Sequence, residues 1–298
     1  MSKIRIKNFG PIKEGYIENG GWISIDKVTV FIGNQGSGKS TVAKLISTFS
    51  WIEKAIYRGD IDDTLSRQEV LDYMSFQRIN NYVKPDTIIE YEGDMLKIVF
   101  TGQTTPHFEK QTENNHRVPQ IVYIPAERNF LSSIKNPYAV KGLPETLRSF
   151  AIEYKNSQSK YAHRMIPLPI GNVKYQYIEG NEEKSLIYGQ DYILNLTEAA
   201  SGYQSFIPMY MVTGFLIEQI KNKVEKLDVN QEVRKAREKD KILNDASLTS
   251  DEKISKANEI DSKYINSYLI NIVEEPELNL FPTSQWEMLK SLLEATIS

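Results

Sequence analysis

The chain has 298 residues, of which 40% are hydrophobic and 25% are charged, and its formal net charge is −3. These values are ordinary for a globular protein, and they give no overall basic signal for nucleic acid or an anionic membrane. The absence of cysteine excludes disulfides, thiol catalysis and cysteine-ligated metals, and it fits the cytoplasmic location that we expect. No apolar run is long enough to cross a bilayer and no signal-peptide stretch is visible, so we expect no membrane partner.

The N-terminal residues predict an antiparallel β entry. Short strands are expected over residues 3–7, 14–18 and 22–25, with turns at Asn8-Phe9-Gly10-Pro11 and Asn19-Gly20-Gly21. A further run, Lys27-Val28-Thr29-Val30-Phe31-Ile32, is rich in β-branched and aromatic residues and predicts a buried strand.

A glycine-rich segment follows this run directly. Residues 33–40 fit the P-loop pattern G-x-x-x-x-G-K-[ST], and a helix is predicted over residues 39–57. Glycines allow positive φ and close backbone approach, so that N–H groups can point at phosphate oxygens, and the helix dipole adds to their effect. In this pattern Lys39 reaches the β- and γ-phosphates and Ser40 holds Mg²⁺. The candidate nucleotide-binding residues are Gly33, Asn34, Gln35, Gly36, Ser37, Gly38, Lys39, Ser40 and Thr41.

The middle of the chain predicts helices alternating with short strands. The predicted helices cover residues 60–82, 143–161 and 203–227. The predicted strands, several of them in hairpins, cover residues 87–91, 95–100, 120–124, 173–178, 185–188 and 192–196. Residues 102–118 are polar and predict a loop.

Residues 228–263 differ from the rest, because they contain few large apolar residues and a near-even mixture of acidic and basic ones. Thr249-Ser250-Asp251-Glu252 fits a capping box and predicts the start of a new helix. We therefore expect two antiparallel helices that form a charged arm, with a partly disordered solvated insertion as the alternative. The balanced charge favours a solvated face over contact with DNA or a partner.

An acidic segment near the C-terminus supplies candidate catalytic groups. The apolar strand predicted over residues 269–273 is followed by Glu274-Glu275-Pro276-Glu277, and a last helix is predicted over residues 284–295. A P-loop needs an acidic partner at the end of a neighbouring strand. We expect Glu274 to contact Mg²⁺ or its water, and Glu275 to orient and deprotonate the attacking water, with Lys39 completing the catalytic set. The alternative is an acidic strand end on an exposed surface.

The segment Ala199-Ala200-Ser201-Gly202-Tyr203-Gln204, at the start of a predicted helix, adds a third motif. The three motifs in this order resemble the ABC-type ATPases, and within them the RecF, SMC and OLD-like group. The stretches at 8–12, 123–128 (Tyr-Ile-Pro-Ala-Glu-Arg) and 275–282 look like the OLD-like branch. That branch includes ATPases of bacterial anti-phage and retron-type defence systems.

The resemblance implies an α/β fold: a P-loop NTPase head of ABC type with an antiparallel β entry, a mixed core sheet and an inserted charged helical hairpin. Residues 1–227 and 264–298 would form the head, and residues 228–263 the arm. It also implies a homodimer through ATP. Ser201 and Gly202 of one subunit, in a signature completed by Gln204, would contact the γ-phosphate held by the other subunit's P-loop. A Ser-Gly helix cap is the alternative for Ser201. Residues 277–282 take the place of the D-loop.

The chain departs from the family at several positions. Ala200 stands where the signature usually has Ser or Leu, and the Walker B acid is Glu274 rather than Asp. The Q-loop residue stays open between Gln103, Gln120 and Glu127, and Glu127 could instead form a buried ion pair with Arg128.

The family also expects a switch histidine after the D-loop, whereas His107, His116 and His163 all lie upstream. We therefore expect a longer native protein, with an effector such as a TOPRIM nuclease downstream.

The first functional hypothesis is Mg²⁺-dependent ATP hydrolysis coupled to dimer opening and closing, in DNA repair or phage defence. The alternative is a slow-hydrolysing clamp or switch that controls nucleic acid binding or a partner effector. A transporter subunit is disfavoured by the polar arm and the lack of membrane segments. A P-loop kinase is disfavoured because it would leave Ser201 and Gly202 without a role.

Overall fold

The computed structural model describes residues 2–111, 117–134, 136–224 and 227–297 of a mixed α/β protein. The chain divides into two compact units, residues 1–121 with 218–270 and residues 122–217 with 271–298. The chain passes between them within strands β6 (Pro119–Ile124) and β11 (Tyr268–Val273) and within helix α5 (Ser201–Lys221). In the described part of the chain, no helix is long and apolar enough to cross a membrane.

The first unit is built on an antiparallel sheet. Its strands, in the order β2-β1-β3-β4-β5, are β2 (Trp22–Ile25), β1 (Ser2–Phe9), β3 (Val83–Glu92), β4 (Leu96–Thr101) and β5 (His107–Lys110). Alternate residues, such as Ile4 and Ile6 on β1, are fully buried, and each such side chain stabilises the fold by ~1.5–3 kcal/mol. Helix α1 (Lys39–Arg58) packs on this buried face, where Phe49 stacks on Tyr91 with ring centroids 6.1 Å apart.

Two of the predicted N-terminal strands are wrong. Residues 14–18 instead enter a tight turn, with a single bridge between Tyr16 and Gly21 and the 3₁₀ helix η1 (Ile17–Asn19). Residues 27–32 form no strand, and Val28, Val30 and Ile32 are 46%, 70% and 90% exposed. The Asp26 N–H donates to Thr29 Oγ1, 2.9 Å away, and no strand pairing is described for these residues. Because a strand exists only when it is paired, apolar composition alone does not make one.

The other elements of the first unit follow the predictions more closely. The predicted strands at 3–7, 22–25, 87–91 and 95–100 and the helix from Lys39 are confirmed. The helix predicted over residues 60–82 is shorter, as α2 (Arg67–Phe76) followed by η2 (Asn80–Tyr82). The loop predicted over residues 102–118 contains β5, and its residues 112–116 lie outside the described residues.

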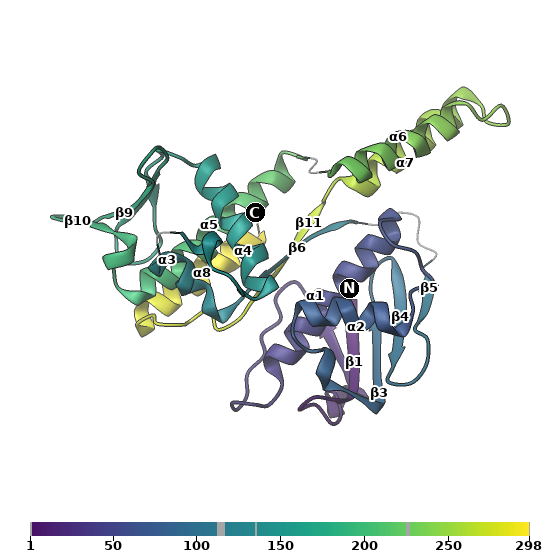
Figure 1. Ribbon diagram of the computed structural model, residues 1–298, viewed down its shortest axis with the longest axis horizontal. Coiled ribbons are helices and arrows are strands. Elements are labelled where there is room, and N and C mark those ends of the chain that lie inside the picture. The colour runs from purple at the N-terminus through teal and green to yellow at the C-terminus, as the bar shows by residue number, and fades with distance from the viewer. Residues whose placement is uncertain (1, 112–116, 135, 225–226, 298) are drawn as a thin grey trace. The chain divides into compact units, whose positions relative to one another are not determined.

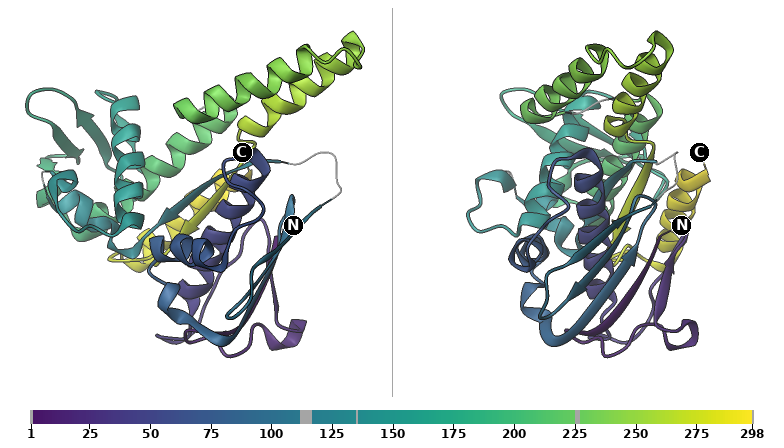
Figure 2. Two further views of the ribbon diagram at one scale, coloured as in Figure 1. Left: turned by 45° about the vertical axis from the view of Figure 1, so that its right-hand side comes forward. Right: turned by 90° about the vertical axis from the view of Figure 1, so that its right-hand side faces the viewer.

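The charged arm is a pair of helices, as predicted. Helices α6 (Val229–Leu243) and α7 (Ser250–Tyr264) run antiparallel side by side in every view (Figures 1 and 2). Each begins with a capping box, Asp228 with Gln231 and Thr249 with Glu252, which satisfies N–H groups that a helix start would otherwise leave unpaired. These caps explain why a segment with so few apolar residues is helical.

The second unit is built around α5 and a small antiparallel sheet. The sheet has the order β10-β9-β8-β7, with β10 (Ile193–Asn195), β9 (Lys184–Tyr188), β8 (Lys174–Ile178) and β7 (Ile166–Pro167). The remaining elements are η3 (Ala126–Asn129), α3 (Phe130–Ser133), η4 (Pro137–Ala139), α4 (Glu145–Lys160), η5 (Leu196–Glu198) and α8 (Pro282–Ile297). Helix α5 buries Phe206, Ile207, Val212 and Leu216.

The predicted hairpin at 173–188 and the strands at 120–124 and 269–273 are confirmed, and β6 and β11 form a separate two-stranded sheet. Helix α5 begins at Ser201 rather than residue 203 and ends at Lys221, six residues before the predicted end at Leu227; residues 225–226 of that prediction lie outside the described residues.

Candidate nucleotide site

The glycine-rich loop lies directly before α1 and is held in shape by its own backbone. The Ser37 N–H donates to the Asn34 carbonyl, 3.2 Å away. Gly36 and Gly38 have φ of +76° and +99°, a region that side chains with a Cβ rarely adopt. Gly38 is buried against the turn that follows β1, where an added Cβ would lie 2.9 Å from Ile12 Cγ1. The turn at residues 8–12 therefore fixes the end of the loop.

The glycine-rich loop gathers hydrogen-bond donors, and several of its backbone N–H groups have no partner in the described part of the chain. Within the described ranges, no hydrogen bond engages the backbone N–H of Gly36, Gly38, Lys39 or Ser40. The first N–H groups of a helix have no partner within the helix. Lys39 Nζ donates to the carbonyl oxygens of Gly33 at 2.8 Å and Asn34 at 2.9 Å, so its ammonium group lies against the loop. Free amides and an ammonium at a helix N-terminus form an anion site.

These residues fit a magnesium nucleoside triphosphate. A Cβ added at Gly36 would meet nothing within 4 Å, so the loop leaves open space beside its backbone. The Ser40 side chain is exposed at the first turn of α1 and offers a hydroxyl oxygen, the ligand type that Mg²⁺ prefers. Asn34, Gln35 and Ser37 are exposed in the loop, and Thr41 is buried in the helix.

The acidic segment forms a turn that continues from β11. The Glu274 N–H donates to the Ile124 carbonyl at 3.0 Å, so the pairing of β11 with β6 extends to this residue. The Glu274 side chain is half-buried, whereas Glu275 is exposed and has a left-handed φ of +42°. Tyr123 is buried next to Glu274, and burial, followed by the charge of Glu274, raises the pKa of its hydroxyl.

Arg128 lies beneath this turn and is fully buried. Its guanidinium donates to the carbonyl oxygens of Glu274 and Glu275, each 2.7 Å away, and to the Ser205 carbonyl of α5 at 3.0 Å. No ion pair with Glu127, the arrangement that the sequence allowed, is present among the described residues, and Glu127 is exposed. Arg128 is thus a backbone-binding residue rather than half of an ion pair.

The signature segment opens α5. The Ala200 carbonyl accepts from the N–H groups of Tyr203 at 2.9 Å and Gln204 at 3.3 Å, so Ala200 is the N-cap residue and Ser201 is the first residue of the helix rather than its cap. Ser201 is exposed, and its hydroxyl makes no hydrogen bond within the part of the chain that the structure describes. Gly202 is buried, and an added Cβ there would lie 2.8 Å from the Asn279 carbonyl oxygen.

The amide of Gln204 is used within this segment. Its Nε2 donates to the carbonyls of Leu196 and Thr197 at 3.2 Å and to that of Ala199 at 3.0 Å. Gln204 therefore holds the turn before α5, a structural use that the sequence analysis did not assign.

The predicted site residues fall into two groups. Residues 33–41 belong to the first unit, and Glu274, Glu275, Ser201, Gly202 and Gln204 belong to the second. Within the second unit, the signature segment, the acidic turn and the stretch at 123–128 come together. Sequence reasoning singled out each of them but not Arg128 as their link; an arginine following a buried apolar strand was the available signal.

The three candidates for the Q-loop residue are divided between the two units, Gln103 and Gln120 in the first and Glu127 in the second. Gln120 Oε1 accepts from Asn266 Nδ2 at 2.7 Å in the first unit, and Gln103 and Glu127 are exposed.

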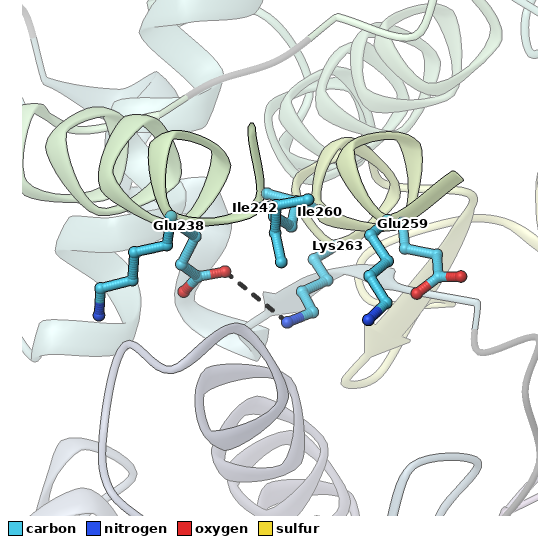
Figure 3. Close-up of a pocket in the computed structure, with 7 residues that line it drawn as sticks. Glu238, Ile242, Glu259, Ile260 and Lys263 are labelled. Atoms are coloured by element: carbon cyan, nitrogen blue, oxygen red, sulfur yellow. Dashed lines mark ion pairs between the residues drawn. The ribbon is translucent and has the colours of Figure 1, made fainter. Parts of the chain in front are cut away.

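The charged arm neutralises many of its own charges. A groove of about 320 Å³ lies between α6 and α7, where Glu238 pairs with Lys263 at 3.7 Å (Figure 3). Lys235 and Lys239 both pair with Asp261, at 2.9 and 2.7 Å. This pattern agrees with the solvated face predicted from the balanced charge.

The base of the arm is tied to the end of α1. Asp60, just after that helix, pairs with Arg234 of α6 at 2.6 Å. Arg58 Nε donates to the Lys263 carbonyl of α7 at 2.9 Å. The helix that begins at the glycine-rich loop therefore ends at the arm.

No model of a known protein family matches the chain, and no curated protein matches it in a sequence search.

Proposed function

We propose that this protein is the ATP-binding head of an ABC-type ATPase of the RecF and OLD-like kind, and that it hydrolyses ATP with Mg²⁺. The observation that carries the proposal is the loop at residues 33–40, where unpaired amides and the Lys39 ammonium meet at the start of α1. Such a site binds the phosphates of a nucleotide. The resemblance of the three motifs to that family favours ATP over other triphosphates.

In this proposal each group of predicted site residues has its own chemical role. The loop amides and Lys39 bind the β- and γ-phosphates, and Ser40 and Glu274 would hold Mg²⁺. When bound, that ion neutralises charge on the phosphate oxygens. Glu275 accepts a proton from the water that attacks the γ-phosphorus, while the bond to the bridging oxygen breaks and ADP leaves. Phosphoryl transfer depends mainly on such positioning and charge neutralisation.

We further propose a cytoplasmic homodimer closed by ATP. In this arrangement Ser201 and the Gly202 amide meet the γ-phosphate held by the second subunit. The exposed, unbonded hydroxyl of Ser201 supports a role outside its own helix. Work in DNA repair or phage defence is the setting that the family resemblance favours.

A second candidate function is a slow ATP-dependent switch acting on a nucleic acid or an effector protein. The observation that favours it is the tie between the end of α1 and the arm, through Asp60 with Arg234 and through Arg58. A change at the nucleotide loop could pass along α1 to the arm without fast turnover.

Phosphate release from Mg²⁺-ATP by the wild type, Lys39→Ala and Lys44→Ala tests the proposal. Lys44 lies on the same helix and carries the same charge but is outside the loop. Lys39→Ala should lose turnover by about 10³-fold, because an ammonium that stabilises phosphate charge is removed, whereas Lys44→Ala should keep it. Equal turnover in the two variants would refute the assignment of the loop.

A further inference from the structure

We propose that Arg128 is a positioning residue that joins the signature helix to the acidic turn, so that Ser201 and Glu275 move as one body. The inference rests on the proposed function, because it gives a role to the residues assigned there. It adds a coupling within each subunit between two motifs that serve different ATP molecules in the dimer.

The first support is the set of atoms that Arg128 binds. Its side chain is fully buried and, within the described part of the chain, donates only to backbone carbonyls: those of Glu274, Glu275 and Ser205, that of Pro125 at 3.2 Å and that of Pro276 at 3.5 Å. A guanidinium is planar and carries its donors in a rigid fork, so these carbonyls are held in a fixed arrangement. Ser205 and Glu274, which lie 77 and 146 positions from Arg128 in the sequence, thereby share one side chain.

The second support is the backbone of Glu275. Its φ of +42° is unfavourable for a residue with a Cβ and persists only where the surroundings hold it. Arg128 binds the carbonyls of the two peptide groups on either side of the Glu275 Cα, each at 2.7 Å. Fixing both peptides fixes the direction in which the Glu275 side chain leaves the chain.

The third support is a second contact between the same two motifs. The Gly202 backbone packs so closely on Asn279 that an added Cβ would lie 2.8 Å from its carbonyl oxygen. The Ser132 hydroxyl, from the short helix that follows Arg128, donates to the Gln204 carbonyl at 2.9 Å. The first turns of α5 are therefore held from both sides, and a displacement of Ser201 is transmitted to the acidic turn.

The charge of Arg128 suits this place. Burial lowers its pKa to about 10, while the nearby carboxylates of Glu277, Glu275 and Glu274 act in the opposite direction. The group is therefore charged at neutral pH, and charge-assisted hydrogen bonds to carbonyls are stronger than neutral ones.

The consequence concerns communication between two nucleotides. In the dimer, Ser201 would meet the γ-phosphate held by the partner, whereas Glu275 would act on the ATP of its own subunit. Through Arg128, the filling of one site sets the position of the base at the other. Turnover should then depend on both sites being filled.

The test compares Arg128→Lys with the control Ser133→Ala. Lysine keeps the charge but cannot reach several carbonyls at once. Ser133 is exposed on the short helix that follows Arg128, and its hydroxyl donates to the Phe130 carbonyl at 2.9 Å, so Ser133→Ala leaves both motifs untouched. Arg128→Lys should lower kcat by about a hundredfold with KM for ATP almost unchanged, because the phosphates are held by the P-loop. Ser133→Ala should keep kcat within about threefold.

A second readout, amide hydrogen exchange, does not require activity. In Arg128→Lys, exchange should rise together in residues 201–206 and 274–280, while the sheet of β1, β3 and β4 keeps its protection. In the wild type, both segments should share one opening free energy as denaturant is added.

The proposal is overturned if Arg128→Lys keeps the wild-type kcat, or if the two segments of the wild type open independently. An inactive wild type whose two segments open together would contradict the proposed function and still support the positioning role of Arg128. If Arg128→Lys does not fold, the wild-type exchange experiment decides the matter alone.

Discussion

The glycine-rich loop and the acidic turn differ in whether their backbone polar groups are hydrogen-bonded within the protein. At the loop, the amides of Gly36, Gly38 and Ser40 have no partner within the described ranges. At the turn, the carbonyls of Glu274 and Glu275 are bound by a buried arginine. Open donors suit a place that binds a ligand, because the ligand supplies their partners. Bound carbonyls suit a place that must hold a side chain in one direction.

Glu275→Gln is expected to have the largest effect on the turn. Removing the proton acceptor should lower ATP turnover by about 10²-fold or more, while ATP binding at the loop is retained. Phosphate release reports on the acidic turn and nucleotide binding reports on the glycine-rich loop, so measuring both separates the two regions.

Glu277→Gln is the matched control, because Glu277 is exposed in the same turn, carries the same charge and is not among the proposed catalytic or metal-binding residues. Turnover that falls equally in both variants would mean that the turn responds to its total charge, and Glu275 would lose its assignment.

Glu53 extends the comparison to α1, the helix that follows the glycine-rich loop, because both oxygens of its buried carboxylate are hydrogen-bonded. It accepts from the N–H groups of Met95 at 2.6 Å and Leu96 at 3.0 Å and from the Tyr91 hydroxyl at 2.8 Å. Burial raises its pKa from 4.5 to about 7. Between these values the folded state binds more protons than the unfolded state, so this group lowers stability as pH rises through that window.

The loss of unfolding free energy that Glu53 causes should approach about 3 kcal/mol at pH 7. Glu53→Gln should remove this dependence of stability on pH. Urea unfolding of both proteins at pH 5 and pH 7.5 measures it. Lys54, whose pKa burial lowers to about 7, adds stability as pH rises above about 7, and it does so equally in both proteins, so the difference between them isolates Glu53. An unchanged slope in Glu53→Gln would assign the pH dependence to other groups.

Gly38→Ala should have a smaller effect, on the loop alone. Alanine at position 38 must adopt a φ of +99°, and its Cβ would lie too close to Ile12. The amides of the loop should therefore shift, and the affinity for ATP should fall by about tenfold. Titration with a fluorescent ATP analogue measures the affinity.

Gly142→Ala controls for backbone strain, because Gly142 has a φ of +77° with nothing within 4 Å of an added Cβ. If Gly38→Ala keeps the wild-type affinity, ATP binding does not depend on the close packing of Gly38 against Ile12.

Local sequence signals predicted many of the helices and strands and the turn-like conformation of the glycine-rich loop. The capping box at Thr249 marked the start of α7, and two strand-like runs on either side of Glu92-Gly93-Asp94 marked the hairpin of β3 and β4. The P-loop pattern marked a loop whose glycines have left-handed φ in the structure. Each of these signals lies within a few residues of the element that it specifies.

The errors arose where distant residues decide the outcome. Val28, Val30 and Ile32 have strand composition, but strand formation depends on a partner that composition does not reveal. The contacts of Arg128 join residues that are 77 and 146 positions away in the chain. The apolar strand before Arg128 indicates that its side chain is buried, but it does not distinguish these contacts from a buried ion pair with Glu127.

The central claim is that the open donors of residues 33–40 bind ATP, and calorimetric titration of Mg²⁺-ATP into the wild type and Lys39→Ala tests it most directly. We predict saturable binding of one ATP per chain in the wild type and its loss in Lys39→Ala. Binding of equal strength in both proteins, or none in the wild type, would contradict the claim.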